Sequence, residues 1–426
     1  MEEAIGISVF FTDPPGIGGK LRRDPEDFVV EEIPSGMKEE TGGRYTVAKV
    51  MSRNWETNRL VRRFARTLGV SRKRIRFAGT KDKRALTTQY FQFDLPKDRV
   101  KSLRLRDVRI LNVFETNEKL EIGKLHGNRF RVVIRDIGLP IQVAVRDAER
   151  IRKTLIEAGG FPNFFGLQRF GAVRPITHLV GKHIIHGDFE SAVMTYIANP
   201  IEGEPEEAFQ ARKALQEDRD FASALKNFPD KLSFEKAVLN HLVRFEDDFI
   251  GALNQLPENL LLMFIHAYQS FLFNRILSRR MERGLPLNDS ILGDYVLPLN
   301  KYGLPDHDRW ILVNKRNLQK ISAQVRKRKA FVSAVLFGSE SIFSEGEMGE
   351  IEREIISEEG VEREDFIIPK MRKLSSKGTR REVLAPLTEL EIEREEDSIV
   401  LRFQLNKGCY ATSLLREFMK TEATHY

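Results

Sequence analysis

The chain has 426 residues, 41% hydrophobic and 31% charged, which is enough to bury one large core or two smaller ones. A formal net charge of +7 is modest for this length and suits a protein that meets a polyanion on one face, without requiring one. The single cysteine, Cys409, excludes an internal disulfide, and the first residues lack the apolar core of a signal peptide. We expect a soluble cytoplasmic protein, because the most apolar stretch, Leu260 to Phe273, is too short and too polar to span a bilayer.

The first predicted elements are a short strand and a helix. Residues Asp27 to Glu32 follow a proline and are typical of a strand. Residues Thr57 to Leu68 predict a helix with Thr57 as its N-cap. Its apolar residues share one face, and its arginines lie largely on the remaining surface: Leu60, Val61, Phe64, Ala65 and Leu68 against Arg59, Arg62, Arg63 and Arg66.

Three further segments alternate as strands do. Residues Tyr90 to Leu95 alternate after a charged loop. In Asn128 to Arg135 the apolar side chains Phe130, Val132 and Ile134 share one face, whereas Arg129, Arg131 and Arg135 share the other. Near the C-terminus, Ile399, Leu401, Phe403 and Leu405 repeat this pattern. Strands are therefore predicted at both ends of the chain.

The middle of the chain is predicted to be helical. Helical periodicity marks the ranges 145–158, 206–218 and 253–283. A glutamate-rich segment at 340–365 is typical of a solvated helix or a mobile loop. We therefore predict a helical insertion at 160–376 inside a strand-rich domain formed by 1–159 and 377–426.

The segment Phe77 to Ala85 (FAGTKDKRA) holds one carboxylate, Asp82, among basic residues. An aspartate beside cations keeps a low pKa and stays ionised, as a nucleophile or a base acting on a sugar carbon requires. The cations, Lys81 among them, could also hold RNA phosphates, as could the basic run from Arg72 to Arg76. From these residues alone, a salt-bridged surface turn is the preferred interpretation of the loop around Asp82, and for the basic run a solvated face explains the pattern as well as a phosphate contact does.

Two aromatic segments offer further candidates. In His126 to Phe130 (HGNRF), Phe130 could stack on a flipped base, although the alternation alone favours Phe130 as core. Asn128 could form a hydrogen bond with a neighbouring base, sugar or aspartate. The loop Phe161 to Gly171 (FPNFFGLQRFG) could stack bases through Phe165 and contact phosphate through Arg169. It could equally form a packed hinge between domains. The histidines at 178, 183 and 186 match no zinc spacing.

Taken together, these segments resemble the TruD family of tRNA pseudouridine synthases. The similar segments are GTKDKRA, PEDFVVEE, HGNRF, PNFFGLQRFG, SFLFNRIL and KGCYATSLLREF, and together they span nearly the whole chain. The long insertion, with KLSSKGTRREVL near its end, resembles the archaeal and eukaryotic branch of the family.

The resemblance implies an α+β fold, with a pseudouridine synthase core of mixed β-sheet and flanking helices and an inserted, largely helical TRUD domain. It implies isomerisation of uridine in tRNA, at position 13 of the D-arm, with no cofactor, no metal and no obligate protein partner. It assigns catalysis to Asp82, base stacking to Phe130, and a role in the same motif to Asn128. Arg22 stands where bacterial members have a lysine, so its pairing with Asp82 would have a different geometry.

Two other classes of function compete with this reading. A family member without activity would bind RNA through the same basic and aromatic residues, but the intact loop around Asp82 argues against it. An RNA glycosidase or nuclease would usually need a second carboxylate about 5–10 Å away, and the loop offers none.

Overall fold

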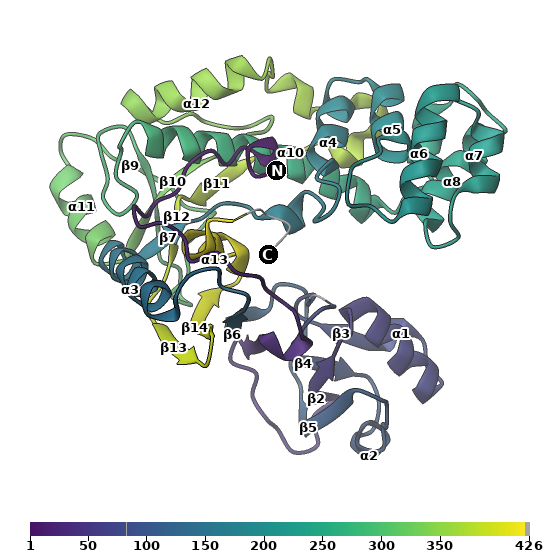
Figure 1. Cartoon of the computed structure of the whole chain (residues 1–426), viewed down its shortest axis with the longest axis horizontal. Helices are drawn as coiled ribbons and strands as arrows, with labels where there is room; N and C mark the ends of the chain where they lie inside the picture. The colour runs from purple at the N-terminus through teal and green to yellow at the C-terminus, as the bar shows by residue number, and fades with distance from the viewer. Residues whose placement is uncertain (82, 422–426) are drawn as a thin grey trace. The chain divides into compact units, whose positions relative to one another are not determined.

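The computed structural model of the chain describes residues 1–81 and 83–421 (Figure 1). It consists of two compact units, each built from two separate stretches of sequence. We call Thr12–Phe161 with Ala385–Tyr426 the sheet unit, and Met1–Phe11 with Pro162–Leu384 the inserted unit. The chain passes from one unit to the other between Phe11 and Thr12, and again within each of the paired strands β7 (Gly160–Pro162) and β12 (Leu384–Pro386).

The sheet unit is organised around an eight-stranded mixed sheet in the order β13-β14-β6-β1-β4-β2-β5, with β3 paired to β4. β1 and β4 run parallel, whereas β6 is antiparallel to both β1 and β14. The strands are β1 (Phe28–Pro34), β2 (Tyr45–Arg53), β3 (Ile75–Phe77), β4 (Leu86–Phe93), β5 (Val108–Thr116), β6 (Leu125–Ile134), β13 (Leu390–Glu395) and β14 (Ser398–Asn406). The expected mixed sheet formed by both chain ends is confirmed.

The sheet unit also contains helices, and the first of them packs on the sheet through the apolar face that the sequence predicted. The helices are α1 (Thr57–Leu68), α2 (Lys97–Lys101), α3 (Ile141–Ala158) and α13 (Ala411–Met419). Phe64 of α1 meets the rings of Phe91 and Phe93 on β4 edge-on, with centroids 5.2 and 5.7 Å apart. Edge-to-face contacts of this kind add to the hydrophobic gain from burial. The core therefore fixes α1 against β4, at the strand that follows the charged loop.

The inserted unit is largely helical, as expected, and contains a four-stranded sheet in the order β11-β10-β8-β9. Its helices are α4 (Thr177–Ile185), α5 (Phe189–Ala198), α6 (Glu206–Asp218), α7 (Phe221–Asn227), α8 (Ser233–Leu242), α9 (Phe249–Leu253), α10 (Glu258–Glu282), α11 (Leu318–Arg326) and α12 (Gly346–Glu358). Its strands are β8 (Tyr295–Pro298), β9 (Ile311–Leu312), β10 (Ala330–Leu336) and β11 (Thr379–Glu382).

The first eleven residues of the chain belong to the inserted unit, whereas the sequence grouped them with the strand-rich domain. Asn274 Nδ2 donates a hydrogen bond of 2.9 Å to Ile5 O, and Ser278 Oγ donates one of 2.9 Å to Gly6 O. Both donors are buried on α10, so the N-terminal segment satisfies polar groups that would otherwise lie unpaired in the core.

Helix α10 is long and apolar enough to cross a membrane by length and composition alone, with a mean hydropathy of 1.3 in its most apolar window. In the structure 67% of that window is buried inside the protein. Its neighbours include α4, α12 and β10. Burial on several sides is what a central core helix requires, and it accounts for apolar residues all around the helix.

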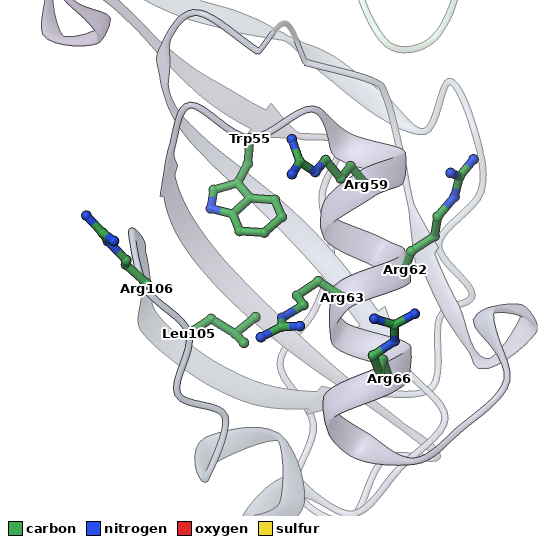
Figure 2. A pocket seen from close by; sticks show the side chains of 7 residues that line it. All are labelled: Trp55, Arg59, Arg62, Arg63, Arg66, Leu105 and Arg106. Atoms are coloured by element: carbon green, nitrogen blue, oxygen red, sulfur yellow. The ribbon is translucent and has the colours of Figure 1, made fainter. Parts of the chain in front are cut away.

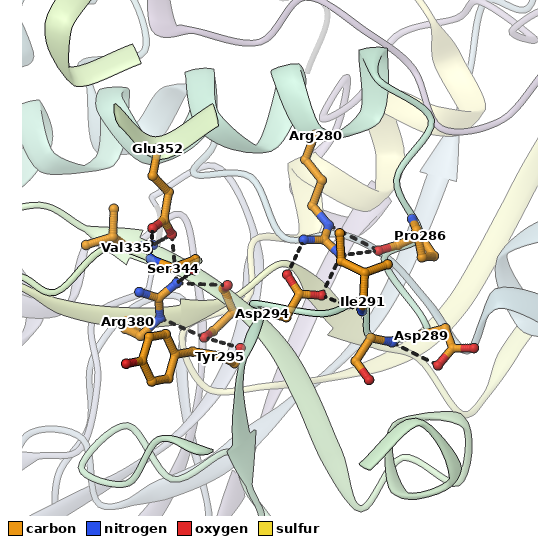
Figure 3. A network of polar contacts seen from close by, with 12 residues as sticks. Arg280, Pro286, Asp289, Ile291, Asp294, Tyr295, Val335, Ser344, Glu352 and Arg380 are labelled. Atoms are coloured by element: carbon orange, nitrogen blue, oxygen red, sulfur yellow. Dashed lines mark hydrogen bonds and ion pairs between the residues drawn. The ribbon is translucent and has the colours of Figure 1, made fainter. Parts of the chain in front are cut away.

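Two buried ion pairs hold the inserted unit together (Figure 3). Arg280 forms a bidentate ion pair with Asp294, in which Nη1 lies 2.7 Å from Oδ1 and Nη2 lies 3.0 Å from Oδ2. Arg380 Nη2 lies 2.7 Å from Glu352 Oε1. All four side chains are fully buried. The expectation that the glutamate-rich segment is solvated is therefore wrong for Glu352, since α12 turns this carboxylate into the core.

Candidate active site

The charged loop before β4 is anchored by the start of α1. The Lys81 backbone N–H donates a hydrogen bond of 2.8 Å to Thr57 Oγ1, and the Gln89 side-chain amide of β4 donates to Gly79 O. Thr57 is not the N-cap that the sequence predicted, because Glu56 takes that place and accepts from the N–H groups of Asn58 and Arg59, each at 2.8 Å. The Thr57 hydroxyl is thereby free to hold the loop.

Lys81 also connects this loop to the neighbouring strand β1. Its Nζ donates a hydrogen bond of 2.8 Å to Glu32 Oε2, and the two side chains are only 6% and 1% exposed. Removing one partner of such a buried pair would leave an uncompensated charge, at a cost of about 3–5 kcal/mol. In the structure Lys81 is therefore held by Glu32, while Lys83 and Arg84 remain exposed on the same loop.

Strand register brings Asn128 and Phe130 to the same region. Glu32 lies opposite Asn128, and Val30 lies opposite Phe130, in the antiparallel pair of β1 and β6. Directly opposed residues share a face of the sheet, so Glu32, Asn128 and Phe130 all project from one side. The Oδ1 atom of Asn128 is buried and has no hydrogen-bond partner among the residues that the structure describes.

Phe130 lies in a row of aromatic side chains with 8% of its surface exposed. Its ring stacks on Phe403 at 5.1 Å and meets Phe28 edge-on at 6.1 Å. The Arg22 guanidinium lies 4.3 Å from the centroid of Phe28, a cation–π contact. Arg22 has a positive φ of 59°, which is uncommon for a residue with a side chain.

The opposite face of the same strands is polar. Glu31 accepts a hydrogen bond of 2.7 Å from Lys49 Nζ and lies 3.6 Å from the guanidinium of Arg129. The hydrogen bond to Glu31 raises the pKa of Lys49 above its ordinary value. The predicted alternation of Arg129 with Phe130 is confirmed, with arginine exposed and phenylalanine buried.

Phe165 and Arg169 lie in the inserted unit and line a pocket of about 230 Å³. Asn274 holds the Phe165 backbone through both its N–H (2.9 Å) and its C=O (3.0 Å), and the Arg381 guanidinium lies 4.2 Å from the ring centroid. Arg169 Nε donates to Ser270 Oγ at 3.2 Å. Burial, together with the charge of Arg169, lowers the pKa of the neighbouring His266.

The histidines of the inserted unit form no metal site in the part of the chain that the structure describes. His178 packs between the rings of Phe170 at 5.3 Å and Phe271 at 4.9 Å. Burial lowers its pKa to about 4, which keeps the imidazole neutral. His178 is therefore a core aromatic residue.

The structure thus gathers Lys81, Asn128, Phe130 and Arg22 around one face of β1 and β6, whereas Asp82 itself lies outside the described residues. Sequence reasoning missed the contacts made by Glu32, Thr57 and Gln89. Glu32 occurs in the PEDFVVEE segment, and its place on the apolar face of the predicted strand was a signal that this carboxylate is buried and paired. The sequence offered no such signal for the contacts of Thr57 and Gln89.

Comparisons with known proteins show which proteins the chain is similar to. A family described as tRNA pseudouridine synthase D (TruD) matches residues 4–418. The chain is 43% identical to a relative from Methanococcoides burtonii over 99% of this chain and 98% of the relative, and 38% identical to one from Thermococcus onnurineus over 96% and 97%. Both relatives are named as probable tRNA pseudouridine synthase D.

A crystal structure of a TruD protein from Methanosarcina mazei superimposes with a TM-score of 0.86 at 41% identity. The match covers 100% of this chain and 98% of that one. The similarity therefore extends through both units and includes every segment on which the resemblance was based. The chain belongs to the tRNA pseudouridine synthase D (TruD) family.

Proposed function

We propose that the chain isomerises uridine to pseudouridine in tRNA, at position 13 of the D-arm, with Asp82 as the catalytic aspartate. Family membership supports pseudouridine synthase activity on tRNA. The position and the residue rest on the match of GTKDKRA to the family's catalytic loop. The observation that carries the proposal is the Lys81–Glu32 bond, because it fastens this loop to β1 opposite Asn128.

In this proposal the protein holds the uridine close to the catalytic carboxylate. The N-glycosidic bond between C1′ and N1 breaks, the uracil turns, and C5 bonds to C1′ of the sugar. C5 then loses its proton and N1 gains one, so the product is an isomer of uridine. Asp82 either attacks C1′ or removes the C2′ proton to give a glycal, and both routes need it ionised. Lys81 acts as a positioning residue, since Glu32 and Thr57 hold it, and the exposed Lys83 and Arg84 supply phosphate contacts.

The remaining residues orient the base and the RNA. Asn128 offers a buried side-chain carbonyl oxygen to an N–H donor. One face of the Phe130 ring is stacked on Phe403, so the uracil would stack on the opposite face. Arg22 contributes positive charge beside Phe28 on the same side of the strands. In the inserted unit, Phe165 and Arg169 line a pocket that we propose contacts the tRNA.

A product assay tests this function directly. We expect an unmodified tRNA transcript that has been incubated with the protein, then treated with a carbodiimide and with mild alkali, to keep one carbodiimide adduct that stops primer extension beside uridine 13. A transcript with cytidine at position 13 is the control and should give no stop there. An abasic or cleaved product would replace the synthase with a glycosidase or nuclease, and unchanged RNA would leave only binding.

A second prediction separates base stacking by Phe130 from a purely structural role. We expect Phe130→Leu to stay folded and to lose turnover, because loss of base stacking costs about 1–3 kcal/mol. Phe130→Tyr keeps the ring face and should be tolerated. Thermal melts and single-turnover rates on tRNA measure the two effects separately.

The matched control is Phe403→Leu, which alters the ring that stacks on Phe130. Because this residue is core in either reading, its replacement should lower the melting temperature more than the rate. A fully active Phe130→Leu protein would end the stacking assignment.

A further inference from the structure

A strongly basic hollow lies in the sheet unit, beside α1. Its volume is about 390 Å³, and it is lined by Trp55, Arg59, Arg62, Arg63, Arg66, Leu105 and Arg106. Trp55 and Leu105 are half-buried against the core that α1 covers, so they form an apolar floor. Figure 2 shows the arginine side chains of α1 along one side of this floor, with Arg106 on the other.

The four arginines of α1 are not neutralised by the protein. None of Arg59, Arg62, Arg63 and Arg66 forms an ion pair with any residue in 1–81 or 83–421, and α1 contains no acidic residue. Arginines at the C-terminal end of α10 differ, since Arg275 and Arg279 of the helix and Arg283 at its C-cap each contact glutamates of α12. The positive charge of these four α1 arginines is therefore available to bind an anion.

Helix electrostatics gives no reason for this cluster. Arg59 and Arg63, like Arg62 and Arg66, are four residues apart on one helix, where like charges repel. Arg59 also lies in the first turn, where the helix dipole disfavours a cation. A cluster that opposes helix stability in both respects suggests selection for a bound anion.

The position of Trp55 indicates which class of anion the hollow could bind. The Arg59 guanidinium lies 5.6 Å from the centroid of the Trp55 ring. Within the described ranges the indole Nε1–H of Trp55 has no hydrogen-bond acceptor. A solvated basic helix face would need neither an indole nor a hollow beside it. An aromatic floor with a cationic rim matches a nucleotide, which joins a flat base to a phosphate.

We propose that this hollow binds a second segment of the RNA substrate, with phosphates on Arg62 and Arg66 and an unpaired base against Trp55. This inference rests on the proposed function, because it takes RNA as the substrate. Helix α1 also begins with Thr57, which holds the Lys81 loop. At 1.5 Å per residue, Arg62 and Arg66 lie about 8 and 14 Å along the axis from that anchor. RNA in the hollow would thus be positioned relative to the catalytic loop.

Trp55 supplies a direct optical test, since the chain has only two tryptophans. In a Trp310→Phe protein all indole emission comes from Trp55. We expect an unmodified tRNA transcript to quench this emission in a saturable manner, whereas polyglutamate of matched charge does not. No quenching by bound tRNA, or equal quenching by polyglutamate, would overturn the assignment of a base to Trp55.

The phosphate contacts are tested by salt dependence. In Arg62→Gln/Arg66→Gln the slope of log affinity against log salt should become shallower by about 1.4–1.8, because each lost phosphate contact removes about 0.7–0.9. The control Arg316→Gln/Lys320→Gln removes two exposed cations of the inserted unit that form no ion pair with the described residues. Equal slopes for both double variants, or a slope that matches the unsubstituted protein, would overturn the inference.

The two proposals fail in different ways. If the unsubstituted protein forms no pseudouridine in the transcript, the proposed function fails whatever the slopes are. If pseudouridine forms but the Arg62→Gln/Arg66→Gln slope and the Trp55 emission do not change, only the hollow is wrongly assigned.

Discussion

Replacing Asp82 by asparagine is expected to abolish pseudouridine formation and to leave tRNA affinity within a few-fold. The amide keeps the size of the side chain but can neither attack C1′ nor accept a proton from C2′. The rate should fall by at least about 10⁴-fold, the upper range for a general base. Affinity should persist because the exposed Lys83 and Arg84 of the loop are unchanged. Single-turnover rates and filter binding on the same transcript measure both quantities.

The matched control is Asp94→Asn, the same exchange just after β4. Asp94 is half-exposed and lies 3.8 Å from Arg74, so its loss should alter neither rate nor affinity by more than a few-fold. An Asp82→Asn protein that keeps most of its turnover would remove this residue from the mechanism. A protein that loses turnover only because tRNA no longer binds would make Asp82 a binding residue instead.

Replacing Glu352 by alanine is expected to lower the stability of the inserted unit by about 3–5 kcal/mol. Its carboxylate accepts hydrogen bonds from Val335 N at 3.0 Å, Ser344 N at 2.6 Å and Arg380 Nη2 at 2.7 Å (Figure 3). The substitution would leave a buried guanidinium and two backbone donors without this partner. For a unit of this size the melting temperature should fall by about 6–20 °C.

Two variants make this prediction specific. Glu350→Ala removes a glutamate from the same helix, but this side chain is 63% exposed and its loss should change stability by less than about 0.5 kcal/mol. The double replacement Glu352→Leu/Arg380→Met should recover the part of the loss that comes from the uncompensated guanidinium, because an apolar pair carries no buried charge, while the N–H groups of Val335 and Ser344 still lack this acceptor. Equal melting temperatures for Glu350→Ala and Glu352→Ala would contradict the importance of this ion pair.

Local periodicity predicted those parts of the fold in which one face is buried. Helix α1 has the expected bounds and apolar face, and β14 begins one residue before the alternation of Ile399 to Leu405. The strand after the loop begins at Leu86 rather than Tyr90, because Leu86 to Thr88 pair in parallel with β1, a long-range contact that alternation does not record.

The polar contacts of the site could not be predicted in this way. Lys81 and Glu32 are separated by 49 residues, and a charged residue in isolation is assumed to face solvent. Thr57 looked like a helix cap because its residue type favours that role, yet Glu56 caps the helix and leaves the hydroxyl to the loop. Family resemblance located the motifs, while the contacts that hold them depend on tertiary packing.

The order of strands in the large sheet has a consequence for synthesis of the protein. β6 pairs with β1 on one side and with β14 on the other, and about 260 residues lie between the end of β6 and the start of β14. At cellular translation rates this interval lasts roughly 13–50 s. During that time the nascent chain carries β6 with one edge unpaired, and such an edge is a template for pairing with another chain. Truncated forms that end before Ser398 would keep this edge permanently, and they should therefore be prone to aggregate even when the inserted unit is complete.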